Sequence, residues 1–229
     1  MQMLPKPRQI KLKVLSHNLL NRKVVKVDFE AIEPSDFEFL PGQHVNLRIG
    51  ESIGRTYSIC SDLIDKKHFS IVVSAGHRGI GSNFLKHLQP GDEVSGLGPL
   101  GRFYIRNEHR PSIIFYASGT GISPILTMLY KLASADGVKS KIKLYWGLHS
   151  EKDIILQGRL EELKNWLDFD YEIFLSSPPK NWNGKVGYVT KDMKAVEGAQ
   201  YYIFGVKEMV SAVKDSLKRL GVRDEDIIG

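Results

Sequence analysis

Short runs in which apolar and polar residues alternate fill the first half of the chain. Alternation covers Lys11–Leu15, Val24–Phe29, His44–Ile49 and Phe69–Val73. Turn sequences such as Pro41-Gly42 and Pro90-Gly91-Asp92 separate these runs. A period of two residues is typical of strands with one buried face. Several short strands at close spacing predict an antiparallel β-barrel, and one short helix is expected near Ser82–His87.

From about Pro111 the pattern changes to short apolar runs that alternate with segments of helical spacing. The expected strands are Ser112–Ala117, Lys143–Trp146, Tyr171–Leu175 and Tyr201–Phe204. The expected helices are Ser123–Ala133, Leu160–Leu167 and Glu208–Leu220. Alternating strands and helices predict a parallel sheet with helices on both faces. We therefore expect two domains, residues 1–107 and 108–229, joined by a linker at Asn107–Arg110.

The composition narrows the class of protein. Of the 229 residues, 42% are hydrophobic and 25% are charged, as in ordinary globular proteins. The single cysteine, Cys60, excludes an intramolecular disulfide and a cluster held by several cysteines of this chain. The N-terminus has no signal-peptide pattern, and no apolar run is long enough to span a membrane. A cytoplasmic location is expected. The histidines show no metal-ligand spacing, so no metal site is expected.

The chain carries a formal charge of +6. Two interpretations stay open, namely simple solubility and attraction of an acidic partner or a phosphorylated ligand. The basic residues are scattered and form no nucleic-acid motif, so a nucleic-acid partner is not expected.

The segment Gly54-Arg55-Thr56-Tyr57-Ser58 carries the first candidate chemistry. An arginine can grip a phosphate with two parallel hydrogen bonds. Tyr57 lies two positions on, so in a strand it shares a face with Arg55 and can pack against a flat ring. Ser58 offers a hydroxyl and a backbone N–H to a ring nitrogen. The alternative is an ordinary edge strand with a surface arginine and a packed tyrosine.

A glycine-rich loop, Gly76-His77-Arg78-Gly79-Ile80-Gly81-Ser82-Asn83, runs into the expected short helix. Ser82 is a candidate N-cap, and the free N–H groups of a helix start bind phosphate. The alternative is a flexible hairpin turn.

Two further loops follow strands of the second half. Gly119-Thr120-Gly121-Ile122-Ser123-Pro124 stands between a buried strand and a helix, where an open parallel sheet binds nucleotides. The loop from Gly147 to Asp153 follows the next expected strand, and it contains His149, Ser150 and Lys152 beside the carboxylates of Glu151 and Asp153. A capped surface turn, built by Ser150 or Asp153, explains the second loop equally well.

Six motifs together resemble the ferredoxin–NADP reductase family, which includes bacterial oxygenase reductases and NAD(P)H:flavin reductases. They occur in the family's order at residues 39–43, 55–58, 79–82, 90–94, 98–103 and 119–124. The resemblance implies an antiparallel β-barrel flavin domain followed by a Rossmann-like α/β NAD(P) domain. It also implies FAD as the bound cofactor and NADH or NADPH as the electron donor. In the family the loop at Gly147–Asp153 contacts the adenosine ribose, where His149, Ser150 and Lys152 would favour NADPH and Glu151 or Asp153 would favour NADH.

The resemblance also implies roles for residues of this sequence. At the flavin, Arg55 binds phosphate, Tyr57 stacks on the ring and Ser58 lies near N5, with Thr56 in the same motif. The other flavin contacts are implied for Val72, Val73, Gly81, Ser82 and Asn83. The implied NAD(P) contacts are Gly119, Thr120, Gly121, Pro124, His149, Ser150, Ser176, Gly205, Val206 and Met209. Tyr57, Ser58 and Thr120 are the expected catalytic residues.

Two positions depart from the family. Many members have a cysteine beside the transferred hydride, and the corresponding residue here is Phe204. The chain ends at Ile227-Ile228-Gly229, without the aromatic residue that many relatives place over the flavin. The expected function is transfer of reducing equivalents from NAD(P)H through FAD to a separate acceptor, with an iron–sulfur protein as the expected partner. Release of reduced flavin and a non-catalytic electron-transfer or regulatory role remain alternatives.

Overall fold

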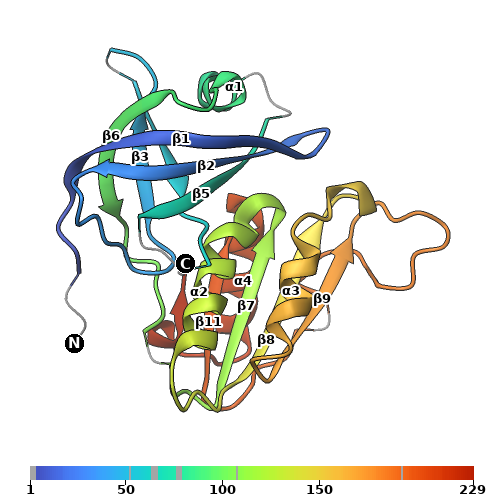
Figure 1. Ribbon diagram of the computed structural model, residues 1–229. Helices are drawn as coiled ribbons and strands as arrows, with labels where there is room; N and C mark the ends of the chain where they lie inside the picture. The colour runs from blue at the N-terminus through green and yellow to red at the C-terminus, as the bar shows by residue number, and fades with distance from the viewer. Residues whose placement is uncertain (1–3, 52, 63–66, 76–78, 107, 192) are drawn as a thin grey trace. The chain divides into compact units, whose positions relative to one another are not determined.

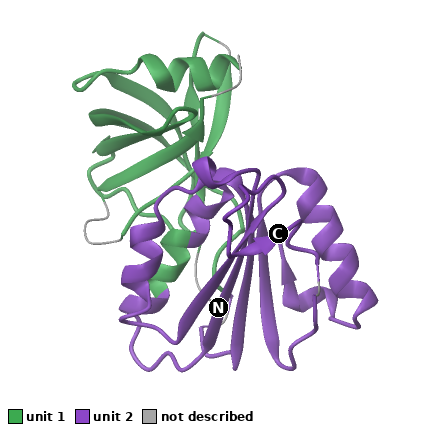
Figure 2. Ribbon diagram, turned by 90° about the vertical axis from the view of Figure 1, so that its right-hand side faces the viewer, with its two compact units in different colours: residues 1–105, 126–131 green, residues 106–125, 132–229 purple. Residues whose placement is uncertain are grey.

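The computed structural model describes residues 4–229 except 52, 63–66, 76–78, 107 and 192 (Figure 1). The chain divides into two compact units, coloured separately in Figure 2. Unit 1 comprises Met1–Ile105 and Leu126–Lys131, and unit 2 comprises Arg106–Ile125 and Leu132–Gly229. The expected domain boundary after residue 107 stays a prediction.

Unit 1 is built on an antiparallel sheet. Its elements are β1 (Arg8–Asn21), β2 (Val24–Glu33), β3 (His44–Arg48), β4 (Gly54–Ser58), β5 (His68–Ser74), α1 (Ile80–His87) and β6 (Glu93–Leu100). The six strands lie in the order β4-β3-β6-β1-β2-β5. An isolated antiparallel bridge between Cys60 and Ser70 connects the segment after β4 to β5. Because this bridge brings the two edges of the sheet together, the sheet curls into a half-barrel.

The barrel core follows from the alternation in the strands. Every second residue is buried from Ile10 to Val14 of β1 and from Val25 to Ala31 of β2. Leu85 of α1 is fully buried in the same apolar cluster. The helix is thereby held against the sheet by the apolar side of its second turn.

Unit 2 is a parallel sheet with intervening helices. Its strands are β7 (Ser112–Ser118), β8 (Lys141–Leu148), β9 (Phe169–Leu175), β10 (Lys185–Val186), β11 (Ala199–Phe204) and β12 (Ile227–Ile228). Its helices are α3 (Gln157–Leu163) and α4 (Lys207–Arg219), with 3-10 turns at Gly119–Gly121, Glu151–Asp153 and Asp224–Asp226. The helix α2 (Ile122–Ser134) begins and ends in unit 2, and its middle, Leu126–Lys131, belongs to unit 1. The strand order is β10-β9-β8-β7-β11-β12.

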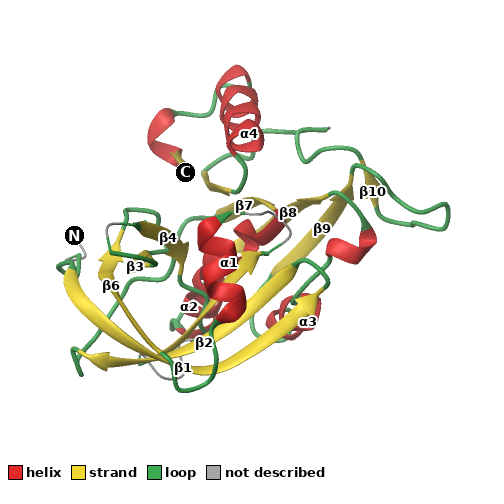
Figure 3. Cartoon of the chain, turned by 90° about the horizontal axis from the view of Figure 1, so that it is seen from above, coloured by secondary structure: helices red, strands yellow, loops and turns green. Residues whose placement is uncertain are grey.

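Helices cover both faces of this sheet. Figure 3 shows α4 on one face and α3 on the other. Val213 and Leu217 of α4 pack with Ile114, Tyr116 and Ile203 of the sheet. Strands buried on both faces explain the continuous apolar runs of the sequence.

The predicted fold class is confirmed, with corrections to single elements. The predicted helix Leu160–Leu167 begins earlier, at Gln157, and ends at Leu163. After Leu163 the backbone tightens into i to i−3 bonds, such as Trp166 N–H to Leu163 O at 3.1 Å. Among the described residues, no helix is long and apolar enough to cross a bilayer.

Candidate cofactor sites

The Arg55–Ser58 motif forms β4, an edge strand of the half-barrel. Tyr57 pairs with Val45 of β3 and is only 8% exposed, whereas Arg55 is exposed. Alternation puts both side chains on one face of the strand. Thr56 lies on the opposite face, where its hydroxyl accepts a 3.4 Å hydrogen bond from Asn46. Arg55 and Tyr57 therefore lie on the same face of β4, as predicted.

The first turn of α1 lies against this face. A Cβ atom added to Gly81 would lie 2.5 Å from the hydroxyl oxygen of Tyr57 and 3.0 Å from Cγ of Arg55. Any side chain at position 81 would enter this space. The structure thus brings together two motifs that are about 25 residues apart in the sequence.

The hydroxyl of Tyr57 is buried and has no hydrogen-bond partner among the described residues. Burial raises the pKa of Tyr57, and the charge of Arg55 opposes that shift. An unpaired buried hydroxyl costs about 1–3 kcal/mol, so its presence here points to a polar partner outside the protein chain. A cofactor that carries phosphate and hydroxyl groups fits Arg55, Tyr57 and the start of α1.

Ser82 does not cap α1, contrary to the prediction. Gly79, in extended conformation, is the N-cap residue, and no side chain caps the helix. Ser82 lies one turn further on, where its hydroxyl donates to the carbonyl of Ser74 at 3.0 Å. Because no side chain caps the helix, its first N–H groups remain available to an anion. Residues 76–78 of the predicted loop lie outside the described residues.

The remaining predicted flavin contacts lie on β4, β5 and α1. Val72 is buried, and Val72 and Val73 pair with Lys26 and Val25 of β2. The carbonyl of Asn83 bonds the imidazole of His87 at 2.7 Å.

His44, on β3, is a neighbour of the motif that the sequence did not single out. It pairs directly with Ser58, and burial lowers its pKa. A Cβ atom on Gly101 would lie 2.7 Å from its ring. The alternation of His44–Ile49 predicted a strand, but the pairing that sets His44 opposite Ser58 depends on the register of β3 with β4, which the alternation does not contain.

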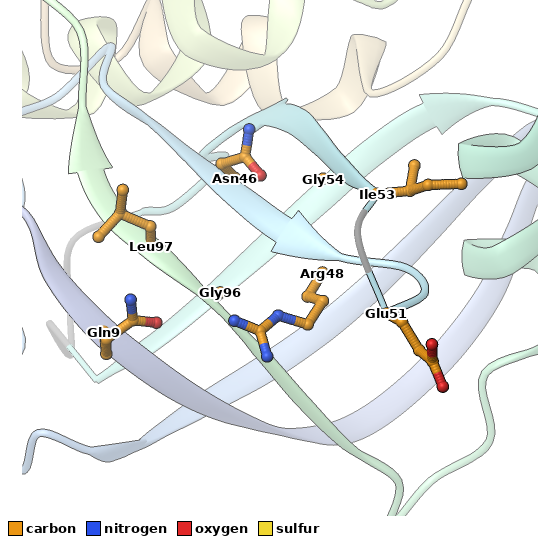
Figure 4. A pocket seen from close by; sticks show the side chains of 8 residues that line it. All are labelled: Gln9, Asn46, Arg48, Glu51, Ile53, Gly54, Gly96 and Leu97. Atoms are coloured by element: carbon orange, nitrogen blue, oxygen red, sulfur yellow. The ribbon is translucent and has the colours of Figure 1, made fainter.

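A cavity of about 240 Å³ lies elsewhere on the half-barrel (Figure 4). It is lined by Gln9, Asn46, Arg48, Glu51, Ile53, Gly54, Gly96 and Leu97. None of the predicted cofactor residues lines it. Arg48 and Arg55 are both exposed arginines on adjacent strands. A substitution of Arg48, which is not a predicted cofactor residue, is therefore a suitable control for a substitution of Arg55.

In unit 2 the predicted loop Gly119–Gly121 is a 3-10 turn at the carboxyl end of β7. The indole N–H of the fully buried Trp146 donates to Gly119 O at 3.0 Å. Ser123 Oγ donates to Thr120 O at 2.9 Å. Pro124 is the third residue of α2. These bonds fix the loop from beneath and leave the side chain of Thr120 half-buried.

The end of β11 lies directly beside this turn. A Cβ atom on Gly121 would lie 2.6 Å from the carbonyl oxygen of Phe204. The N–H of Val206 donates to Ser118 Oγ at 3.0 Å, which ties the Phe204–Val206 turn to β7. Ser118 and Trp146 were missed by sequence reasoning, since their roles depend on which strands are neighbours.

Around Gly205 the packing is tight. Its added Cβ would lie 2.1 Å from Ser118 Oγ and 2.8 Å from Cε of Met209. Gly205 therefore lies next to Gly121, and Met209 packs against Gly205. Contact of Gly205, Val206 and Met209 with NAD(P) stays a prediction. Phe204 is half-buried at the end of β11.

At the ends of β8 and β9, His149 and Ser176 share a hydrogen bond of 3.2 Å. Ser150 and Asp153 form a reciprocal capping box for the turn Glu151–Asp153. Ser150 and Asp153 therefore build the capped surface turn that the sequence analysis gave as the alternative for this loop. His149 and Ser176 lie at the carboxyl edge of the sheet, where open α/β sheets bind ligands.

The family models match both halves of the chain. The oxidoreductase FAD-binding domain matches residues 11–105, and the oxidoreductase NAD-binding domain matches residues 115–215. Ferredoxin–NADP reductase B of Sorangium cellulosum is 33% identical over 215 residues, which cover 87% of each chain. The chain belongs to the ferredoxin–NADP reductase family. NADH-cytochrome b5 reductase 1 of Cryptococcus neoformans is 30% identical, over 91% of this chain and 78% of that protein.

Further relatives of this reductase span a range of systems. The toluate 1,2-dioxygenase electron transfer component of Pseudomonas putida is 32% identical, over 89% of this chain and 62% of its own length. The Amycolatopsis cytochrome P450 reductase GcoB has the same fold, with a TM-score of 0.87 at 23% identity over 99% of this chain and 70% of that one. The reductase is thus an NAD(P)H-dependent flavoprotein oxidoreductase, with FAD as its cofactor.

Proposed function

We propose that the reductase binds FAD through Arg55, Tyr57 and the first turn of α1. The support is the buried, unpartnered Tyr57 hydroxyl beside the close approach of Gly81. Arg55 supplies a fixed positive charge for phosphate, and the N–H groups of Gly81 and Ser82 add donors. The N–H of Asn83 already donates to Gly79 O at 2.9 Å, so the proposed contact of Asn83 is through its side chain. Val72, Val73, Thr56 and Ser58 complete the proposed contacts through β4 and β5.

The proposed NAD(P)H site is the carboxyl edge of the parallel sheet. Gly119, Thr120, Gly121 and Pro124 face the pyrophosphate and nicotinamide, and Gly205, Val206 and Met209 form the adjacent wall. His149, Ser150 and Ser176 lie where the adenosine ribose is expected. Thr120, Tyr57 and Ser58 are the proposed catalytic residues, since they orient the reacting groups.

The protein's task in this proposal is positioning. When bound, FAD supplies the redox chemistry, taking hydride from NAD(P)H and giving up electrons to an acceptor. Tyr57 excludes water from one side of its site through its buried ring. The Gly119–Gly121 turn, held by Trp146 and Ser123, presents a backbone that a ligand can approach closely. Holding FAD and NAD(P)H in a reactive orientation lowers the activation free energy of the transfer, even though no side chain forms or breaks a bond.

The proposed acceptor is a separate iron–sulfur protein. Curated relatives include electron transfer components of dioxygenase systems, one of them named as a ferredoxin–NAD(P)+ reductase component. The single Cys60 cannot hold a multi-cysteine cluster in this chain, and the net charge of +6 suits an acidic partner. A cytoplasmic location belongs to the same proposal and rests on the sparing use of cysteine.

The test is steady-state electron transfer by the FAD-loaded protein. We expect NAD(P)H-dependent reduction of the chemical acceptor ferricyanide, and faster reduction of an acidic [2Fe–2S] ferredoxin at low than at high salt. Ferricyanide reduction without any ferredoxin reduction would refute the iron–sulfur acceptor. No reduction of either acceptor would refute the reductase itself.

Two alternatives are separated by further measurements. A flavin reductase would lose its flavin on gel filtration, whereas the proposed enzyme retains FAD. A regulatory subunit blocked by Phe204 would gain ferricyanide activity on Phe204→Cys, from none in the wild type. The proposal predicts activity in the wild type without that substitution.

A further inference from the structure

One side chain of α2 holds the backbone that follows the Arg55–Ser58 motif. Thr127 lies in the middle stretch of α2, which belongs to unit 1 (Figure 2). Its hydroxyl donates to the carbonyl of Ile59 at 3.1 Å and accepts the N–H of Ser61 at 2.9 Å. A hydroxyl has one donor and two acceptor positions, so both bonds form at the same time. Thr127 therefore binds the peptide groups on either side of Cys60.

The neighbouring strands hold the other backbone groups of this segment. The N–H of Ile59 donates to Gln43 O at 3.0 Å. Cys60 exchanges both backbone bonds with Ser70, at 2.8 Å and 2.7 Å. The strands thus leave over the carbonyl of Ile59 and the N–H of Ser61, and these are the two groups that Thr127 bonds.

The Thr127 hydroxyl lies in a buried environment. Thr127 and Ile59 are fully buried, and Ser61 is 8% exposed. Water therefore has no room to replace the hydroxyl, and a buried backbone group that loses its partner is costly. Without the hydroxyl, the segment has to shift to recover its hydrogen bonds. The position of the backbone after β4 thus depends on this side chain.

The segment begins at a residue of the proposed flavin site. Ser58 is the last residue of β4, and its pairing with His44 is the last of the ladder between β3 and β4. The peptide that follows Ser58 belongs to Ile59, whose carbonyl Thr127 bonds. Small displacements of groups that orient the reactants lower a rate steeply. A shift of Ile59 would therefore reach Ser58 through one covalent connection.

We propose that Thr127 is a positioning residue for hydride transfer, because its hydroxyl fixes the backbone at Ser58 beside the reacting part of the flavin. The inference rests on the proposed function, in which Ser58 contacts FAD. Thr127 touches neither cofactor and acts through the Ile59 peptide.

The test is anaerobic stopped-flow reduction of the FAD-loaded protein at increasing concentrations of NADPH and, separately, of NADH. Thr127→Val removes the hydroxyl and keeps the branched shape of the side chain. We expect its limiting rate of flavin reduction to fall at least about 10-fold, as misplacement of a reacting group does. The coenzyme concentration that gives half of the limiting rate should stay within about 3-fold, because the residues of the proposed NAD(P)H site are unchanged. Thr127→Ser keeps the hydroxyl and should restore the limiting rate to within about 3-fold of the wild type.

Ser140→Ala is the matched control for the loss of a buried hydroxyl. Ser140 is 3% exposed, and its hydroxyl bonds the backbone carbonyls of Glu108 at 3.0 Å and Arg110 at 2.6 Å. Thermal unfolding should show lower stability for both Ser140→Ala and Thr127→Val, because each loses buried hydrogen bonds. Only Thr127→Val should lose the rate of flavin reduction.

Three results would overturn the inference. They are a wild-type limiting rate in FAD-loaded Thr127→Val, a loss of rate in Thr127→Ser as large as in Thr127→Val, and an equal loss in Ser140→Ala. If Thr127→Val does not retain FAD, Thr127→Cys decides, because a thiol is a weaker donor and acceptor than a hydroxyl. A rate below that of Thr127→Ser supports the proposal, and a wild-type rate refutes it. Failure of the proposed function looks different, since the wild-type flavin would then stay oxidised with both coenzymes.

Discussion

A methyl group at position 81 tests the contact on which the FAD site depends. In Gly81→Ala the new Cβ would lie 2.5 Å from the Tyr57 hydroxyl, and real Cβ atoms essentially never lie closer than 3.0 Å to such a neighbour. The phenol or the helix must therefore move by at least 0.5 Å, the difference between these distances. Overpacking of a buried site costs about 1–3 kcal/mol. If that cost falls on the FAD-binding arrangement, affinity drops roughly 5- to 140-fold.

Gly79→Ala is the matched control, two residues earlier in the same segment. Its Cβ would lie 3.9 Å from the nearest neighbouring atom, Ser82 Oγ, and the φ of −73° suits any L-residue. Titration of each flavin-free variant with FAD, followed by quenching of flavin fluorescence, gives the two dissociation constants. Thermal unfolding of the flavin-free proteins checks that both fold. Equal FAD affinity of the two variants would refute the assignment of the Tyr57–Gly81 contact to the cofactor site.

Three other changes give distinct signatures. Arg55→Ala should weaken FAD binding about 10- to 100-fold through loss of a charge-assisted contact, whereas Arg48→Ala should leave it unchanged in the same titration. Gly121→Ala places a Cβ 2.6 Å from the backbone oxygen of Phe204, so NADP+ binding by calorimetry should fall at least about 10-fold while FAD is retained. Asp28→Asn should cost about 1–3 kcal/mol of unfolding free energy at pH 7, measured by urea denaturation, because Asp28 accepts hydrogen bonds from Ser16 and Ser70 at 2.5 Å.

The Asp28 effect has a defined pH dependence. Burial pushes the pKa of Asp28 upward, but hydrogen bonds from Lys26, Ser16 and Ser70 outweigh it, so the pKa is lowered overall. A carboxyl group whose pKa is lower in the folded state stabilises the protein above its unfolded pKa of about 4. This stabilisation is lost as the pH falls through the folded pKa. The wild type and Asp28→Asn should therefore converge in stability at acid pH, and a constant difference between pH 7 and pH 3 would contradict this account.

The other outcomes that contradict the reasoning are equally specific. Equal loss of FAD in Arg48→Ala and Arg55→Ala would show a general effect of positive charge. Loss of FAD together with NADP+ in Gly121→Ala would show global damage rather than a local change at the turn.

The sequence predicted the elements whose periodicity extends over several residues. The alternation in β1, β2 and β3 and the apolar runs of β7, β9 and β11 are long enough to be recognised. β10 and β12 have two residues each, which is too few for any period to show. Helix ends were less accurate, since α1 begins at Ile80, with Gly79 rather than Ser82 as its N-cap.

The candidate site was predictable to the extent that its motifs are local. Arg55 and Tyr57 share a face because of strand geometry alone. The contact of Gly81 with Tyr57 depends on the packing of α1, which no local pattern contains. Likewise, the hydrogen bonds from Trp146 to Gly119 and from Val206 to Ser118 require the order of the parallel strands.

The measurement that tests the central claim most directly is anaerobic stopped-flow absorbance of the FAD-loaded protein. The protein is mixed with excess NADPH and, separately, with excess NADH. The account predicts that the flavin absorbance bleaches in a single turnover with at least one of the two coenzymes. An FAD-loaded protein whose flavin stays oxidised with both coenzymes would contradict it.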